Sequence, residues 1–218
     1  MIIAIDGPSG SGKSTLGRML ARELNLLYID TGSMYRAVAL ATVEARIDPG
    51  DSEAVVTVAE VAEIDLEGDP DSLKVLLNDR DVTDEIRSES VTAMSSVVST
   101  IPGVRRAMVK RQREMAQRGA VLNGRDIGTV VFPDADLKFF LTASPEERAE
   151  RRFNEDRVSN ANVSLEQTMT EMIERDRRDS TRADSTLKVA DDAIVIDSSG
   201  LSIEQVFARM MEYVHRHH

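Results

Sequence analysis

Residues 1–14, MIIAIDGPSGSGKS, contain the stretch that decides the fold. Residues 7–14 match the pattern G-x-x-x-x-G-K-[ST], whose glycines let successive backbone N–H groups point at one phosphate. The apolar run before the pattern predicts a buried strand, and the helical spacing of Leu16, Met19, Leu20 and Leu24 predicts a helix after it. Since strand, glycine loop and helix are the context that the pattern needs, the sequence predicts a binding site for a nucleoside triphosphate.

Two side chains of this loop have separate expected tasks. Lys13 is a mobile cation suited to the β- and γ-phosphates, and the hydroxyl of Ser14 is suited to ligate Mg²⁺. The positive end of the helix dipole lies at the same place, so the loop is predicted to attract a polyanion.

The composition limits the class of protein. At 218 residues, 41% hydrophobic and 30% charged, the chain is expected to be one soluble globular domain. No apolar run approaches the ~20 residues that span a bilayer, and no signal peptide is expected. The lack of cysteine excludes disulfides and thiol nucleophiles and fits a reducing cytoplasm.

The charge pattern favours a small anionic ligand. A net charge of −11 argues against a protein that coats nucleic acid. Arginine nevertheless outnumbers lysine, and its planar fork suits bidentate contact with phosphate. All three histidines lie in the last four residues, expected to be a solvated terminus, so none is available elsewhere for acid–base chemistry.

The order of apolar segments predicts an α/β fold. Buried strands are expected at 2–5, 26–29, 120–122, 137–141 and 193–196. The helices expected between them run to about residue 46 from an N-cap at Thr31, over 52–62, over 85–99, from Pro102 and over 202–214. Two more are expected to start at capping boxes, one at Ser144 with Glu147 and a second at Ser164 with Gln167 three residues later. Short strands at 64–67, at 73–77 and around Val82 predict a small inserted antiparallel sheet. The fold class is therefore α/β, with a P-loop NTPase-type parallel five-stranded sheet, helices on both faces and this insertion.

The residues alone leave the roles of two groups of arginines undecided. Arg36 follows the strand at 26–29 and is either a surface arginine or a group that folds back to an anion at the helix start. In the helix after Ser164, the stripe of Arg175, Arg178, Asp179 and Arg182 suits either intrahelical ion pairs or an anion site. The residues of this helix that are expected to face the core are Leu165, Met169, Met172 and Ile173.

The sequence at 65–68 matches the D-x-x-G motif of GTPases. We interpret this as a chance match, because the base-reading N-K-x-D motif of GTPases is not present.

Taken together, the segments resemble the bacterial type of cytidylate kinase, among the P-loop nucleoside monophosphate kinases, over essentially the whole chain. The motifs that carry the resemblance are GPSGSGKST (7–15), DTGSMYR (30–36), DVTDEIR (81–87), IPGVRRAMVKRQR (101–113), NGRDIGTVVFPDA (123–135), SPEERAERR (144–152) and ERDRRDSTR (174–182). It implies one domain, 1–218, with a core at 1–50, 100–143 and 183–218, a CMP-binding insertion at about 51–99, a lid at about 144–165 and an arginine-rich helix at 165–182.

The resemblance also implies roles for individual residues. ATP would be held by Gly7, Pro8, Ser9, Gly10, Ser11, Gly12, Lys13, Ser14 and Thr15, with Mg²⁺ on Ser14. The CMP phosphate would be held by Thr31, Arg36, Arg125 and Arg182, the cytosine edge by Ser96, Arg105 and Asp126, and the ribose by Arg175 and Asp179. Lid arginines Arg148, Arg151 and Arg152 would close over the triphosphate, and the catalytic set would be Lys13, Arg36, Arg125, Arg148, Arg152 and Arg182. Many members have an acidic residue where Asn123 stands, so no metal-binding role is assigned to this position.

The implied reaction is Mg²⁺-dependent transfer of the γ-phosphoryl group of ATP to CMP or dCMP, giving CDP or dCDP. The alternatives are a kinase for another nucleoside monophosphate such as UMP, or for another small acceptor, and a non-enzymatic P-loop regulator. We expect no nucleic-acid or membrane partner, a monomer and a cytoplasmic location.

Overall fold

The computed structural model describes residues 1–159, 164–181 and 187–217. Its main sheet has five strands in the order β2-β6-β1-β7-β8, and a second sheet has three strands in the order β3-β4-β5. The strands of the main sheet are β1 (Ile2–Asp6), β2 (Leu27–Asp30), β6 (Ala120–Gly124), β7 (Leu137–Thr142) and β8 (Ile194–Asp197). This parallel sheet with helices, together with the small antiparallel sheet, confirms the predicted fold class.

The chain divides into two compact units, which are described separately. Unit 1 comprises residues 1–26 and 121–218, and unit 2 comprises residues 27–120. The expected division into core, insertion and lid stays a prediction.

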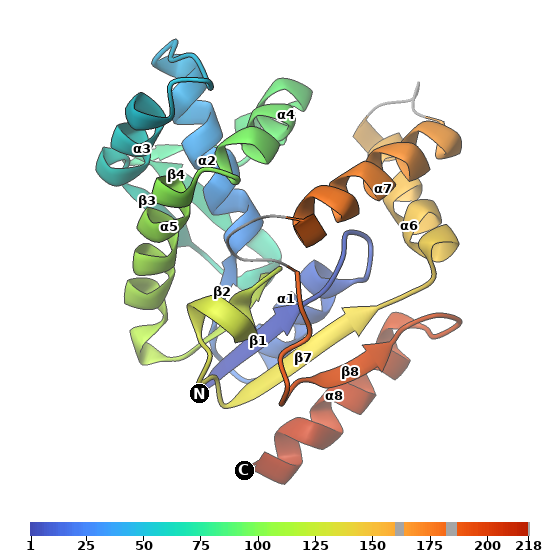
Figure 1. Ribbon diagram of the computed structural model, residues 1–218. Helices are drawn as coiled ribbons and strands as arrows, with labels where there is room; N and C mark the ends of the chain where they lie inside the picture. The colour runs from blue at the N-terminus through green and yellow to red at the C-terminus, as the bar shows by residue number, and fades with distance from the viewer. Residues whose placement is uncertain (160–163, 182–186, 218) are drawn as a thin grey trace. The chain divides into compact units, whose positions relative to one another are not determined.

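Unit 1 is built on parallel strands that are apolar on both faces. β1 pairs with β7 and β7 with β8, placing Ile5 opposite Phe139 and Phe139 opposite Ile194. Near-continuous apolar runs are typical of parallel strands, because helices and further chain cover both faces. The helices of this unit are α1 (Lys13–Glu23), α6 (Pro145–Ser159), α7 (Leu165–Thr181) and α8 (Ile203–His217). α1 packs against α8 and β1, while α6 and α7 pack against each other after the end of β7 (Figure 1).

Unit 2 is organised around α2 (Thr31–Glu44), which packs against α3 (Ser52–Val61), α4 (Glu89–Val98) and α5 (Pro102–Met115). The antiparallel strands β3 (Ile64–Glu67), β4 (Lys74–Leu77) and β5 (Arg80–Asp81) lie in this unit, close to the predicted positions. Asn78 and Asp79 form the turn between β4 and β5 with positive φ angles of 50° and 63°, as turn residues of this type permit. In the part of the chain that the structure describes, no helix has the length and hydropathy to cross a membrane.

Two predicted helix starts were wrong in unit 2. Asp30, not Thr31, is the N-cap of α2: its carboxylate accepts hydrogen bonds from the backbone N–H groups of Gly32 and Ser33. The helix predicted over 85–99 is divided, because Ser88 is extended with ψ 151° between a 3₁₀ turn at Glu85–Arg87 and α4.

Two further expectations were wrong in the helices that follow β7. Ser144 caps α6 by accepting from the N–H of Glu147, but the Glu147 carboxylate does not return the bond and instead accepts from Arg151 and from the N–H of Gly200. The mutual cap predicted at Ser164 and Gln167 is confirmed, with both hydrogen bonds present. In α7, Leu165 and Ile173 are 40% and 55% exposed rather than in the core, while Thr168 and Met172 are buried.

Candidate functional site

The phosphate loop lies between β1 and α1 and depends on glycine for steric reasons. Gly7 and Gly10 have φ angles of +146° and +73°. A Cβ at Gly7 would lie 2.1 Å from the carbonyl oxygen of Leu141, and one at Gly10 would lie 2.6 Å from the carbonyl oxygen of Arg148. The loop is therefore closed against backbone on two sides, which fixes its N–H groups before any ligand arrives.

Lys13 lies inside this loop and is surrounded by other cations. Its Nζ donates to the carbonyl oxygen of Pro8 at 2.5 Å and to the hydroxyl of Ser11 at 3.4 Å. Burial, and then the positive charges of Arg125 and Arg175, hold the pKa of the Lys13 ammonium well below its ordinary value. A polyanion bound here would offset that repulsion, so the cluster is suited to phosphates.

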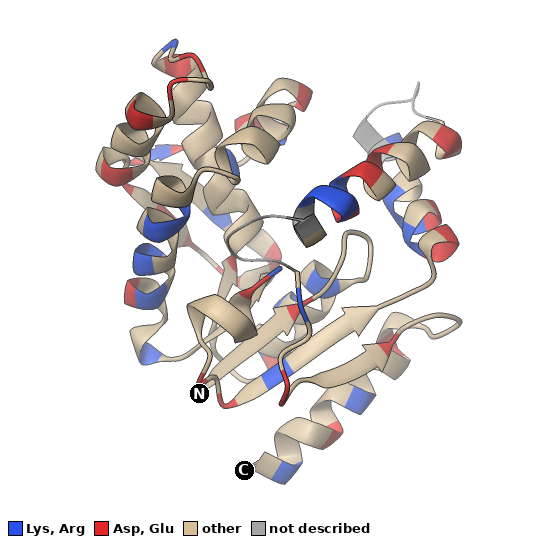
Figure 2. Ribbon diagram, in the orientation of Figure 1, with Lys and Arg blue, Asp and Glu red and all other residues tan. Residues whose placement is uncertain are grey.

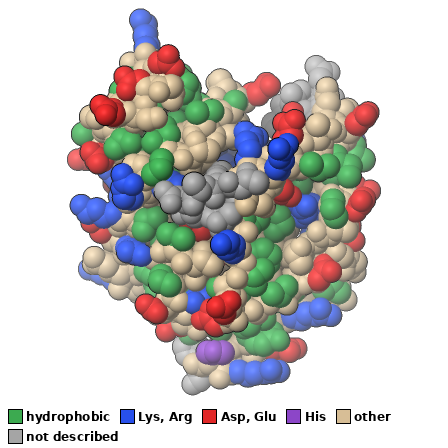
Figure 3. Space-filling view, viewed as in Figure 1, with side chains coloured by type: hydrophobic (Ala, Val, Ile, Leu, Met, Phe, Trp, Pro, Cys, Tyr) green, Lys and Arg blue, Asp and Glu red, His purple; other side chains and the backbone are tan. Residues whose placement is uncertain are grey.

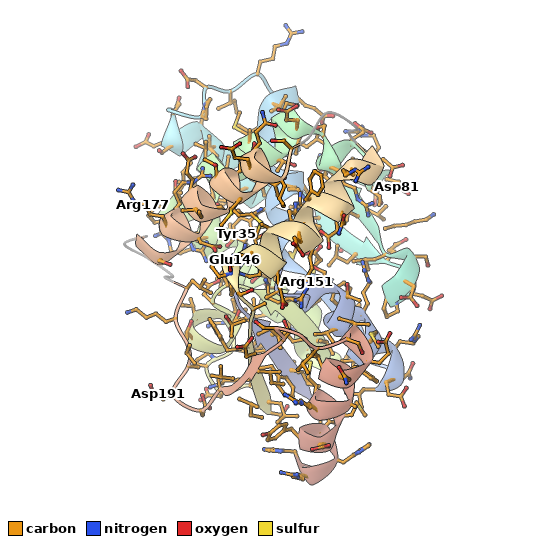
Figure 4. All side chains as sticks on the ribbon, turned by 90° about the vertical axis from the view of Figure 1, so that its right-hand side faces the viewer. Tyr35, Asp81, Glu146, Arg151, Arg177 and Asp191 are labelled. Atoms are coloured by element: carbon orange, nitrogen blue, oxygen red, sulfur yellow. The ribbon has the colours of Figure 1, made fainter. Side chains whose placement is uncertain are left out.

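Arg148, at the start of α6, is bound to the same loop. Its Nη1 donates to the carbonyl oxygen of Ser9 at 3.0 Å and to Oδ2 of Asp176 in α7 at 2.6 Å. Arg151 donates to the carbonyl and hydroxyl oxygens of Ser198 and to Glu147, and Arg152 lies 3.5 Å from Glu155. Arg148 and Arg151 thus contact protein groups outside their own helix; Arg151 is labelled in Figure 4.

Ser14, the expected metal ligand, is exposed at the first turn of α1. The side-chain amide of Asn123, at the end of β6, donates to its hydroxyl at 3.1 Å. Among the described residues there is no cluster of three or more acidic or histidine side chains that could hold a metal ion. This donor set fits Mg²⁺, which keeps water and substrate phosphates as most of its ligands and needs few protein oxygens.

The segment after β6 contacts the root of the phosphate loop. Arg125 Nη1 donates to the carbonyl oxygen of Gly7 at 2.6 Å. Asp126 is buried, and a π-helical turn at Ile127–Val131 follows it. The N–H groups of Ile127 and Gly128 donate to the carboxylate of Asp6 at 2.8 Å and 2.7 Å. Unit 1 therefore brings together Lys13, Arg125 and Asp126.

Asp6 is a buried carboxylate with an altered affinity for protons. Burial raises its pKa from 3.8 to about 6, and the negative charge of Asp126 adds to the rise. The hydrogen bonds from Gly128 and Ile127, and the charge of Lys13, act in the opposite direction.

In unit 2, the group that was predicted to bind an anion lies at the start of α2. Thr31 is buried in the first turn, and Arg36 Nη2 lies 3.7 Å from the Asp30 carboxylate, so Arg36 folds back toward the helix start. Its Nε is buried, and no described residue accepts a hydrogen bond from it. A donor placed in this way suits an anionic ligand.

A second polar group in unit 2 combines α2, α4 and α5. The buried Arg105 guanidinium donates to the carbonyl oxygen of Ser99 at 3.2 Å and lies 5.4 Å from the centre of the Tyr35 ring, a cation–π contact. Tyr35 is labelled in Figure 4. Ser96 is half-buried in α4, and its hydroxyl donates to the carbonyl oxygen of Thr92 at 3.4 Å.

The arginine stripe of α7 is described only in part. Arg175 is half-buried, and its charge lowers the pKa of Lys13, which places it near the phosphate loop. Arg178 is exposed and donates along its own helix to the carbonyl oxygen of Glu174 at 3.4 Å. The side chain of Asp179 and the whole of Arg182 lie outside the described residues. In Figure 2 the basic residues of α7 lie in its second half, beside acidic residues.

Sequence reasoning missed three aspartates that organise these groups. Asp6 and Asp30 each end a strand and accept two backbone N–H groups, and Asp176 pairs with Arg148. The signal available for the first two was a carboxylate that directly follows an apolar run and precedes a ligand-binding turn. Asp176 lies among arginines in sequence, so nothing local distinguished it.

On the face drawn in Figure 3, acidic and basic side chains are interspersed. The expectation that the chain has no nucleic-acid partner stays a prediction.

Comparison with known proteins gives consistent matches. The family model described as cytidylate kinase matches residues 3–216. The chain is 51% identical over 216 residues to a cytidylate kinase of Desulforamulus reducens, covering 98% of this chain and 96% of that protein. It is 50% identical over 206 residues to one of Pelotomaculum thermopropionicum, covering 94% and 91%.

A solved structure shares the fold. The crystal structure of an uncharacterised protein from Eubacterium ventriosum ATCC 27560 aligns over 99% of this chain and 98% of its own, with a TM-score of 0.56 and 12% identity. At this identity the likeness concerns the fold alone.

Proposed function

The chain belongs to the cytidylate kinase family, and on that premise we propose that it transfers the γ-phosphoryl group of ATP to CMP and dCMP. The observation that carries the proposal is the cation cluster at the phosphate loop, where Lys13 lies buried close to Arg125 and Arg175. Such a cluster is costly without a ligand and suits a site that receives several phosphate groups.

The chemistry requires position and charge more than proton transfer. A nucleoside monophosphate is already largely dianionic at neutral pH, because its second pKa is about 6, so its oxygen attacks without a general base. This agrees with a sequence that has no histidine before residue 215. The side chains that touch the transferred group have to hold two polyanions in line and offset the charge of the transition state.

We assign the triphosphate to residues 7–15 of the loop. The N–H groups of the loop hold its oxygens, and Lys13 exchanges its contact with Pro8 for the β- and γ-phosphates. Mg²⁺ would be held by the Ser14 hydroxyl and by phosphate oxygens, where it would neutralise charge on the β- and γ-phosphates. Arg148 and Arg152, both in α6, help to neutralise the same negative charge on the phosphates.

The acceptor contacts are assigned residue by residue. Thr31, Arg36, Arg125 and Arg182 hold the CMP phosphate, and Arg175 and Asp179 hold the ribose. Ser96, Arg105 and Asp126 hold the base: a carboxylate accepts from the amino group of cytosine, and a guanidinium donates to its ring nitrogen and carbonyl. Uracil has an acceptor where cytosine has the amino group, so the carboxylate would repel it.

An ADP-release assay with five acceptor conditions tests the proposal. CMP, dCMP, UMP, AMP and no acceptor are compared, each with Mg²⁺ and with excess chelator. We expect release with CMP and dCMP that needs Mg²⁺ and greatly exceeds release with the other three. Preference for UMP would establish the alternative kinase, equal release without acceptor would establish an ATPase, and no release would favour a non-enzymatic regulator. Gel filtration and cell fractionation test the monomer and the cytoplasmic location that we propose with it.

A further inference from the structure

We propose that Asp6 is a positioning residue for acceptor recognition: it fixes the backbone that carries Arg125 and Asp126. The inference rests on the proposed function, since it concerns how the CMP contacts are held. No acceptor contact is assigned to Asp6 itself, and it acts through the segment after β6.

The first step is the geometry of the carboxylate. Each oxygen of Asp6 accepts one backbone hydrogen bond, Oδ1 from Ile127 at 2.8 Å and Oδ2 from Gly128 at 2.7 Å. Asp6 is only 5% exposed, so water does not compete for these bonds. Two successive N–H groups held by one buried carboxylate fix the peptide planes that directly follow Asp126.

The second step is the carbonyl group of Asp126, which lies in the same peptide plane as the N–H of Ile127. Its own carbonyl oxygen accepts from the N–H groups of Val130 and Val131 at 2.9 Å and 3.2 Å. The peptide plane between Asp126 and Ile127 is thus held at both its N–H group and its carbonyl oxygen. With the main chain fixed, the side chain of this buried residue has few orientations available.

The third step is the connection to the phosphate loop. Asp6 directly precedes Gly7, whose carbonyl oxygen accepts from Arg125 at 2.6 Å. The end of β1 therefore holds the segment at two places, through the carboxylate of Asp6 and through the backbone of Gly7. The same short stretch begins the ATP loop and positions two residues assigned to CMP.

Glycine at position 128 allows the close approach. A Cβ there would lie 3.4 Å from Asp6 Oδ2 and 3.1 Å from Lys138 Cδ. Lys138 has little freedom to move away, because its Nζ donates to Pro133 and to both carboxylate oxygens of Asp192. A methyl group at 128 would therefore crowd the stem of Lys138 and shift the segment that Asp6 holds.

The test compares Asp6→Asn with Asp136→Asn. Asp136 also accepts a backbone N–H, from Ile2 at 2.6 Å, but at the exposed opposite end of β1. An asparagine side chain in place of Asp6 presents a donor to one of the two N–H groups and so loses that bond. We expect the Kd for CMP to rise about tenfold and the CMP-to-UMP ratio of kcat/KM to narrow about tenfold, the effect of one hydrogen bond to a charged group. The Kd for a non-hydrolysable ATP analogue should stay within about twofold, and Asp136→Asn should resemble the wild type in all three quantities.

The outcomes separate the possible failures. Wild-type protein that does not phosphorylate CMP refutes the proposed function, whatever the variants do. Active wild type together with an Asp6→Asn variant of unchanged CMP affinity and base preference overturns the role of Asp6. A loss of kcat with CMP affinity and base preference both unchanged would show that Asp6 only maintains the folded fraction. Should Asp6→Asn not fold, Gly128→Ala tests the same contact with the carboxylate intact, and we expect weaker CMP binding there too; unchanged CMP binding in that variant refutes the inference.

Discussion

Replacing Asp6 by asparagine should change how the free energy of unfolding depends on pH. Burial raises the pKa of Asp6 from 3.8 to about 6 in the folded protein. The folded state therefore binds this proton more tightly than the unfolded state does. The stabilisation that results is fully present below about pH 4 and is lost as the pH rises through about 6.

The size of the effect follows from these two values. A rise from 3.8 to about 6 corresponds to roughly 3 kcal/mol of free energy of unfolding, lost between low pH and neutrality. Roughly 2 kcal/mol of this should fall between about pH 4.5 and 7.5, where urea titrations are practical. The amide that replaces the carboxyl group has no proton to release, so the variant lacks this component.

The measurement is the difference in the free energy of unfolding between wild type and Asp6→Asn across that range. Other titrating groups contribute to both proteins and cancel. We expect the wild type to lose stability relative to the variant as the pH rises from about 4.5, and this loss should level off above about pH 6. Asp126→Asn is the matched control: it removes a neighbouring charge that raises the pKa of Asp6, so the loss should level off at a lower pH. A difference that does not vary with pH, or that varies in the opposite direction, would refute the reasoning.

Three further substitutions test the assigned roles. Lys13→Met should lower kcat at least ~10²-fold, since it removes one preorganised charge at the transferred group, while circular dichroism stays that of the wild type; normal turnover by the folded variant would remove Lys13 from the mechanism. Asp126→Ala should narrow the CMP-to-UMP ratio of kcat/KM by roughly 10–100-fold, and an unchanged ratio would take Asp126 out of base recognition. Arg36→Met should weaken CMP binding about tenfold by calorimetry. Without ligand its Tm should change little, because methionine keeps the packing stem, the buried Nε has no described acceptor to lose, and the ion pair with Asp30 is long at 3.7 Å. A markedly lower Tm with normal CMP affinity would mark Arg36 as structural.

The parts of the fold that depend on local pattern were predictable. The phosphate loop, the strands of the main sheet and the mutual cap at Ser164 and Gln167 follow from residue type and spacing within a few positions. The cap at Ser144 shows the limit of such reasoning. Glu147 has the right spacing, but its carboxylate binds the N–H of Gly200, which lies 53 residues away in the sequence. The spacing of neighbouring residues cannot show that a distant N–H group competes for the same carboxylate.

The ligand roles assigned to the site residues stay predictions, and the contacts that these residues make in the structure could not be predicted from the sequence. Lys13 and Arg125 were expected at the phosphates, and their proximity within unit 1 agrees with this. Arg148 donates hydrogen bonds to Ser9 and Asp176 because of the way α6 and α7 pack. This packing cannot be read from the local spacing of residues. The role of Asp6 was missed for the same reason, because its partners lie more than 120 positions away.

The contact between Gly10 and the start of α6 limits how freely this loop can be exchanged between proteins. A side chain at position 10 would lie 2.6 Å from the carbonyl oxygen of Arg148, which is backbone and cannot turn aside. The glycine is thus required by a neighbouring helix as well as by the phosphates. Grafting a different phosphate loop into this scaffold would therefore require the first turn of α6 to be transplanted with it, and the two segments are expected to vary together as one module.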